Sequence, residues 1–255
     1  MLTKRIGLII WVCIALGTCG AFAEGQDTRN EKSSGVVAKE KEAVREVPLE
    51  IDTQGMLRLS KDEAVWIDRQ RRWVVVDGHV CLRTGTLEMF ACPKGTKEHE
   101  SIVAVEARPF VVHAGLLAVG AKAGKPVRFT PMYEPASGTQ IDVWVLWKDK
   151  DGQPRRAQAQ QWVRDVRTKQ PMVHPWVFAG SSFWRNPETG QSYYQGDGGD
   201  FICVSNFPTA TLDIPVESSQ AEGELMFEAF TEHIPEVGTP VRLVLVPRID
   251  PPRQP

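Results

Sequence analysis

The sequence predicts a β-rich α+β domain in which antiparallel strands predominate and one helix, about residues 109–121, lies buried at the centre. Three observations support this prediction. Short apolar runs recur along residues 64–246 between turn-forming segments. One longer apolar segment begins at Pro109 and stops before Gly124, as a helix would. The chain has 255 residues, of which 42% are hydrophobic, and this is enough to bury a large core.

The first 23 residues have the order of features of a cleavable signal peptide. Lys4 and Arg5 provide a positive start, and an apolar stretch of eleven residues follows from Ile6 to Leu16. Ala21-Phe22-Ala23 then has the small-x-small pattern that signal peptidases recognise. The apolar stretch is shorter than the roughly 20 residues of a membrane-spanning helix. We therefore expect an exported protein, periplasmic or extracellular, with no transmembrane span in its mature form.

The residues around the cleavage site leave one alternative open. Leu16-Gly17-Thr18-Cys19 loosely resembles a lipoprotein signal, in which Cys19 would be lipidated, but Thr18 fits that motif poorly. Residues 24–45 are polar and charged, so we expect a disordered leader. Residues 250–255 contain three prolines and should form a tail. The formal net charge of −2, with both signs interspersed, gives no reason to expect nucleic acid or an anionic membrane as a partner.

The domain between leader and tail should span residues 46–249 and consist mostly of strands. A turn at Gly85-Thr86 would join the strands expected at 73–82 and 87–92 in an antiparallel hairpin. Trp144 and Trp147, three residues apart on one strand, should face opposite sides of the sheet. A division into two subdomains would fall near residues 165–175. The expected strands are 64–68, 73–82, 87–92, 101–106, 141–147, 156–163, 176–184, 192–195, 201–204 and 241–246.

Five blocks of the sequence, spread over roughly residues 60 to 215, form a recognisable series. They are Leu87-Glu88-Met89-Phe90-Ala91-Cys92, Lys97-Glu98-His99-Glu100-Ser101, Leu116-Leu117 before Val119-Gly120, Trp176-Val177-Phe178-Ala179-Gly180-Ser181, and Gly196 to Asp200. In this order they resemble the YdjY-like family of exported bacterial proteins. The resemblance implies one fold unit and an exported location, but no reaction or cofactor, because the family has no established activity. A ferredoxin-type activity would need cysteine ligands, and this chain has no Cys-x-x-Cys pair.

The densest group of reactive side chains provides the candidate site: Cys92, Lys97, His99, Glu100 and Ser101. Cys92, His99 and His113 would be the ligands of a metal, with Glu100 as fourth ligand or base, although this spacing matches no standard zinc motif. Alternatively, Cys92 would be a nucleophile paired with a histidine. The structural alternative is a charged loop-to-strand junction held by ordinary ion pairs, with His113 as a core histidine.

Exposed aromatic residues provide the other candidate. A surface formed by Trp184, Tyr193 and Tyr194 would suit a carbohydrate or peptide ligand. The sequence has no recognisable catalytic triad, phosphate loop or dedicated metal motif. It therefore favours an exported, non-catalytic binding or assembly module of the cell envelope. The alternative is a small metal- or cysteine-dependent enzyme centred on Cys92 and His99.

Overall fold

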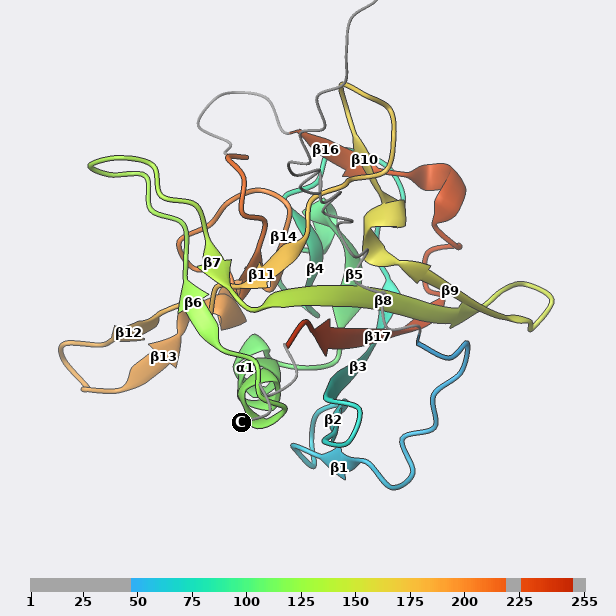
Figure 1. The fold of residues 1–255 in the computed structure, drawn as a ribbon, viewed down its shortest axis with the longest axis horizontal. Helices are drawn as coiled ribbons and strands as arrows, with labels where there is room; N and C mark the ends of the chain where they lie inside the picture. The colour runs from blue at the N-terminus through green and yellow to red at the C-terminus, as the bar shows by residue number, and fades with distance from the viewer. Residues whose placement is uncertain (1–46, 219–225, 250–255) are drawn as a thin grey trace, which may run out of the picture. The chain divides into compact units, whose positions relative to one another are not determined.

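The computed structural model describes residues 47–218 and 226–249, and in these ranges it shows a closed β-barrel with one α-helix beside it (Figure 1). The predicted signal peptide, residues 1–23, the predicted leader, residues 24–45, and the predicted tail, residues 250–255, lie outside the described residues. The domain boundaries expected from the sequence stay predictions.

Eight strands close the barrel. Neighbouring strands are antiparallel except for two parallel pairs, β14–β15 and β4–β5, so the prediction of a mainly antiparallel, β-rich fold is confirmed. Gly78 permits the closure, because it pairs with Val241 on one side and with Val105 on the other, and a Cβ there would lie 2.4 Å from the Ala104 carbonyl oxygen. In spatial order the strands are β3 (Trp73–Val80), β17 (Pro240–Pro247), β8 (Gln140–Lys148), β11 (Trp176–Phe178), β15 (Leu212–Asp213), β14 (Ile202–Cys203), β4 (Met89–Pro93) and β5 (Ser101–Val105), which pairs again with β3.

Alternation along the strands fills the barrel and builds a second core outside it. Val74 and Val76 of β3 belong to the main core, whereas Val75 between them packs on the outer face with Trp144. Trp147 packs against the main core, so the prediction that the two tryptophans face opposite sides is confirmed.

Shorter elements extend the barrel. The turn at residues 149–152 joins β8 to β9 (Pro154–Gln158). Two strands, β1 (Leu57–Arg58) and β2 (Val65–Asp68), continue the sheet beyond β3. Within the described ranges, the two-stranded sheets are β6 (Ala123–Lys125) with β7 (Ser137–Gly138), β10 (Val163–Asp165) with β16 (Phe227–Ala229), and β12 (Phe183–Arg185) with β13 (Ser192–Tyr194). The 3-10 turns of the same ranges are η1 (Glu98–Glu100), η2 (Ala159–Trp162), η3 (Gln195–Gly198) and η5 (Thr231–His233).

The helix α1 spans Pro109–Ala118, and its expected central position is wrong. Only one face is buried, through residues such as Val112 and Leu116, which pack against β2 and β3. Phe110 is exposed, and Leu117 is 49% exposed, although neither is polar. Strand side chains already fill the barrel interior, so the helix can cover the barrel with one side only. The loss of the Leu117 side chain should therefore cost less than about 1 kcal/mol, as at other surface positions.

The predicted hairpin of residues 73–82 with 87–92 is also wrong. β5 pairs with both β3 and β4 and so lies between them. The connecting segment bonds elsewhere: the Cys81 amide donates to the Ile102 carbonyl oxygen and the Leu87 amide to that of Phe227. Cys81 and Cys92 are both free thiols.

The strand expected over residues 176–184 is interrupted. β11 ends at Phe178 and β12 begins at Phe183. Between them Gly180 and Ser181 have φ angles of +90° and +55°, in the left-handed region. This bend directs the chain out of the barrel and into the β12–β13 hairpin.

Candidate functional site

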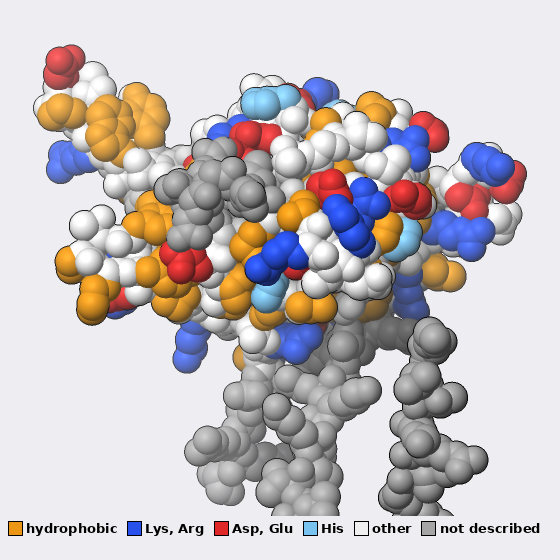
Figure 2. Space-filling model, turned by 90° about the horizontal axis from the view of Figure 1, so that it is seen from above, with side chains coloured by type: hydrophobic (Ala, Val, Ile, Leu, Met, Phe, Trp, Pro, Cys, Tyr) orange, Lys and Arg blue, Asp and Glu red, His pale blue; other side chains and the backbone are white. Residues whose placement is uncertain are grey.

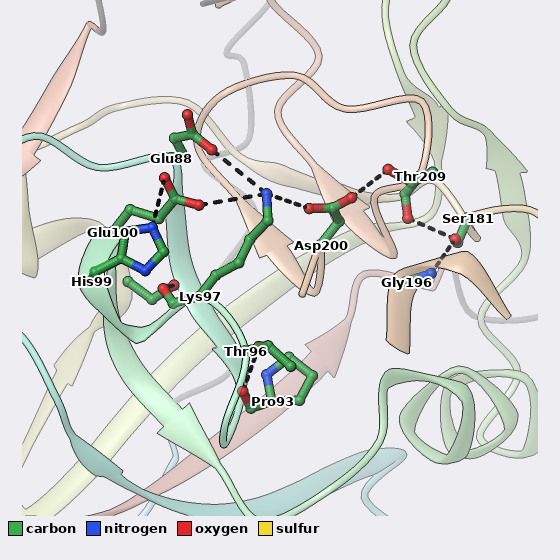
Figure 3. Close-up of polar contacts among 11 residues, drawn as sticks. Glu88, Pro93, Thr96, Lys97, His99, Glu100, Ser181, Gly196, Asp200 and Thr209 are labelled. Carbon is green, nitrogen blue, oxygen red and sulfur yellow. Dashed lines mark hydrogen bonds and ion pairs between the residues drawn. The ribbon is translucent and has the colours of Figure 1, made fainter. Parts of the chain in front are cut away.

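Lys97 lies at the centre of a polar cluster made of four charged residues, Glu88, Lys97, Glu100 and Asp200 (Figure 3). Its Nζ lies 3.0 Å from Asp200 Oδ1, 3.5 Å from Glu100 Oε1 and 3.6 Å from Glu88 Oε2. The ammonium also lies 4.5 Å from the centre of the Phe207 ring. We call these four residues the Lys97 cluster. It sets three carboxylates around one cation.

Local structure explains how segments distant in sequence meet in this cluster. The η1 turn places Glu100 three residues after Lys97 on the same side, within reach of the Lys97 ammonium. Glu88 immediately precedes β4, and its carbonyl oxygen accepts from two amides of the 204–205 segment at 2.9 Å. Gly199, at φ +137°, leaves room for the lysine, because a Cβ there would lie 2.7 Å from Lys97 Cδ.

The charges of the cluster determine its chemistry. Burial raises the pKa of Glu88, and the adjacent Glu100 raises it further. Burial lowers the pKa of Lys97, but the contact with Asp200 and the charges of Glu100 and Glu88 outweigh burial and raise it. Lys97 therefore stays protonated at neutral pH. It acts as a fixed cation rather than as an amine nucleophile.

The other sequence-predicted residues of this region do not share one surface. Cys92 is fully buried, and burial raises the pKa of its thiol despite hydrogen bonds from Ser101 and Thr96. Ser101 is buried as well, and its Oγ donates to the Lys97 carbonyl oxygen at 2.7 Å. His99 is 77% exposed, with its Nε2 3.8 Å from Glu100 Oε2. The thiol lacks the electropositive, accessible surroundings that activate a cysteine nucleophile.

The three potential metal ligands are not brought together. His113 lies on α1, where its Nδ1 is 2.9 Å from the Tyr194 hydroxyl and its ring packs 4.8 Å from that of Phe178. Burial lowers its pKa. Within residues 47–218 and 226–249 no group of three His, Cys, Asp or Glu side chains could hold a metal ion.

A chain of hydrogen bonds leads from the Lys97 cluster to the root of the β12–β13 hairpin (Figure 3). The Thr209 hydroxyl donates to Asp200 Oδ2. The Ser181 hydroxyl donates to the Thr209 carbonyl oxygen at 2.6 Å and accepts from the Gly196 amide at 3.0 Å. The cluster and the hairpin root are thus joined by direct polar contacts.

The hairpin carries aromatic rings on both faces. Trp184 and Tyr193 are cross-strand partners, 48% and 44% exposed, with ring centres 5.8 Å apart. On the opposite face Phe183 packs against Phe110 of α1, at 6.1 Å. Tyr194 is buried and its hydroxyl donates to the Gly180 carbonyl oxygen, so its expected place on the exposed surface is wrong. Phe110, Leu117, Phe183, Trp184 and Tyr193 are all exposed, but only Trp184 and Tyr193 share the outer face of the hairpin, and we call these two residues the aromatic surface.

Sequence reasoning missed several residues. In the sequence, Glu88 stood out only as part of a block that resembles the YdjY-like family, and Asp200 only as part of a glycine-rich turn. Asp213 had no signal: it is fully buried, and its Oδ1 accepts from Asn206 Nδ2 at 3.0 Å and from the Ile214 amide at 2.8 Å. Burial raises its pKa to about 7.

Fold and site together describe a mixed β-barrel domain with one surface helix and an aromatic hairpin. The chain belongs to the YdjY family: the model of the YdjY domain matches residues 65–246, from β2 to β17. No curated protein and no solved structure matches the chain. Among the described residues, none of the helical segments has the length and hydrophobicity needed to cross a membrane.

Proposed function

We propose that this protein is an exported, non-catalytic binding or assembly module of the bacterial cell envelope. The observation that carries the binding function is the aromatic surface, because Trp184 and Tyr193 are cross-strand partners on the outer face of the β12–β13 hairpin and their rings are about half exposed. The N-terminal sequence supports export to the periplasm or beyond the cell, with cleavage after Ala23.

The composition and construction of the aromatic surface fit a recognition role. Trp and Tyr are enriched at binding hot spots, because they offer large rigid faces with a polar edge. Phe183 and Tyr194 pack on the opposite face of the hairpin and hold it in place before a ligand arrives. The entropy lost by Trp184 and Tyr193 on binding is therefore small. A carbohydrate ring or an extended peptide would stack on these two rings.

The alternative, a metal- or cysteine-dependent enzyme centred on Cys92 and His99, has less support. The thiol is fully buried with a raised pKa, whereas the imidazole faces solvent. Glu100, the acid beside His99, is paired with Lys97.

Binding is tested with immobilised oligosaccharides and peptides probed with the labelled protein. We expect a set of ligands that wild type retains and that the double variant Trp184→Ala/Tyr193→Ala loses by tenfold or more in affinity. Leu57→Ala is the matched control, because Leu57 is a comparably exposed apolar residue on β1. Equal binding by all three proteins, or by none, would contradict the proposed surface.

Export is tested separately. After expression of the full chain, N-terminal sequencing should find Glu24 as the first residue of protein recovered outside the inner membrane. Retention of Met1 would overturn export. A lipid on Cys19 would favour the tethered alternative over a soluble product.

A further inference from the structure

A second projection of the molecule, residues 122–138, ends in an apolar tip. We call this segment the arm. Arg128 and Glu134 exchange backbone hydrogen bonds of 3.0 and 2.7 Å across it, and their side chains form an ion pair. These contacts enclose Phe-Thr-Pro-Met-Tyr, residues 129–133, which carry no charged side chain. Met132 is 73% exposed and Phe129 is exposed beside it.

The tip has a fixed shape although it projects. Tyr133 packs against Phe129, with ring centres 6.0 Å apart, and its hydroxyl is buried. Burial raises the pKa of Tyr133 to about 12, with the charges of Asp213 and Glu217 adding to it. Tyr133 therefore points back to the body of the protein, while Met132 and Phe129 are presented to the outside.

The charges of the arm complement an anionic surface. Three of its side chains are basic and one is acidic, and that acid, Glu134, pairs with Arg128. Lys122 and Lys125 are exposed at the base, and no acidic side chain pairs with either among the described residues. The acidic Glu217 lies near the Tyr133 hydroxyl and offsets part of this charge.

We infer that the tip docks on an anionic lipid bilayer. Met132 and Phe129 enter the boundary between headgroups and acyl chains, and the two lysines face the lipid phosphates. An apolar tip with basic residues behind it matches this layered environment, where each basic residue near an anionic bilayer adds to binding. A soluble peptide fits this site less well, because the tip projects and the peptide would itself have to provide a groove to receive it.

The position of the arm relates this docking to the aromatic surface. Ala123, at the start of β6, lies so close to Gly180 that a Cβ on Gly180 would be 2.8 Å from the alanine methyl. The arm and the β12–β13 hairpin thus leave the body at neighbouring points, and Figure 2 shows hydrophobic side chains on the parts that project at the left of the view. A docked arm would hold the aromatic surface close to lipid headgroups.

The test is co-sedimentation with vesicles made of equal parts of phosphatidylglycerol and phosphatidylcholine. We expect Phe129→Ser/Met132→Ser to lower the partition coefficient about tenfold relative to wild type. Val173→Ser/Val237→Ser is the matched control, because both valines are exposed, Val173 to 84%, and lie outside the arm. All proteins carry the same N-terminus, so lipidation or a retained leader cannot produce a difference between them.

Two further comparisons complete the test. Lys122→Gln/Lys125→Gln should weaken binding to these vesicles and leave the weaker binding to pure phosphatidylcholine unchanged. Equal partitioning of the tip variant and wild type would overturn the inference. So would a wild-type dimer in sedimentation velocity that the tip variant loses, because the tip would then contact a second copy. Trp184 and Tyr193 are intact in every variant, so the result is independent of the proposed ligand binding.

Discussion

The Lys97 cluster and the aromatic surface use their residues in opposite ways. Lys97, Glu88 and Glu100 are residue types associated with chemistry, yet each is largely buried and bonded to another member of its cluster. Trp184 and Tyr193 are residue types that usually fill cores, yet their rings are about half exposed. The two regions are joined through Asp200, Thr209 and Ser181.

This difference assigns the two regions different tasks. A charged side chain whose partners are all internal stabilises the positions of the segments that carry it. An aromatic ring left exposed next to others of its kind has unused contact area, and contiguous exposed apolar area marks interaction sites. The Lys97 cluster therefore supports the root of the hairpin, and the hairpin presents the surface proposed to bind a ligand.

The largest expected effect is the loss of the cation. Lys97→Met leaves Glu88, Glu100 and Asp200 without a counter-charge, and breaking a buried pair in this way costs about 3–5 kcal/mol. Urea denaturation at pH 7 measures the change in the free energy of unfolding.

A neighbouring lysine provides the matched control. Lys94 pairs with Glu106 at 2.9 Å, and both side chains are exposed. Lys94→Met should therefore change stability by about 0–1 kcal/mol. If Lys97→Met were equally mild, the cluster would not be structural, and its residues would again be candidates for a site.

Asp213 extends the comparison to a buried acid that has no cation. Its pKa is about 7 in the folded protein and about 3.9 in an unfolded chain. As pH rises from about 4 to 7 the unfolded state loses this proton first, so the contribution of Asp213 to the stability of the wild type falls, by up to about 4 kcal/mol, and then levels off above pH 7. Asp213→Asn removes this penalty and keeps an oxygen to accept from Asn206. It should be 2–4 kcal/mol more stable than wild type at pH 8 and about equal to it at pH 4.

The measurement is urea denaturation of both proteins at pH 4, 6 and 8. The diagnostic quantity is the difference between them, which cancels the titration of all other groups. A difference independent of pH would mean that Asp213 ionises normally in the folded protein.

The sequence predicted the strand content of the fold better than its connections. Alternation located β3, β8 and β17 to within a few residues, because each has one face in the barrel and one outside. It failed for β4, which was expected beside β3. Strand partners depend on the path of the connecting segment, and the insertion of β5 between them has no local signal.

Only part of the candidate site could be predicted from the sequence, for a related reason. Lys97, His99 and Glu100 stood out because they are close in sequence, but the other partners of Lys97, Glu88 and Asp200, come from distant segments. Only the fold brings these together. The apolar composition of α1 likewise could not show that Phe110 and Leu117 face outwards, because burial depends on how much of the barrel remains to be covered.

The smallest expected effect on stability concerns the aromatic surface itself. Trp184→Ala removes one half of a cross-strand aromatic pair, which is worth roughly 0.2–1 kcal/mol, and it leaves no cavity because the ring is exposed. Phe183→Ala, on the other face of β12, loses contacts with Phe110 and Tyr194, but its ring is 60% exposed, so its cost should be similar, roughly 0.2–1 kcal/mol. Both variants are measured by urea denaturation under the conditions used for Lys97→Met. A binding surface needs Trp184→Ala to cost far less than Lys97→Met, because a ring retained for a ligand contributes little to the unliganded fold. If Trp184→Ala cost as much as Lys97→Met, the outer pair would serve to hold the hairpin together, and the exposure of its rings would no longer argue for a ligand.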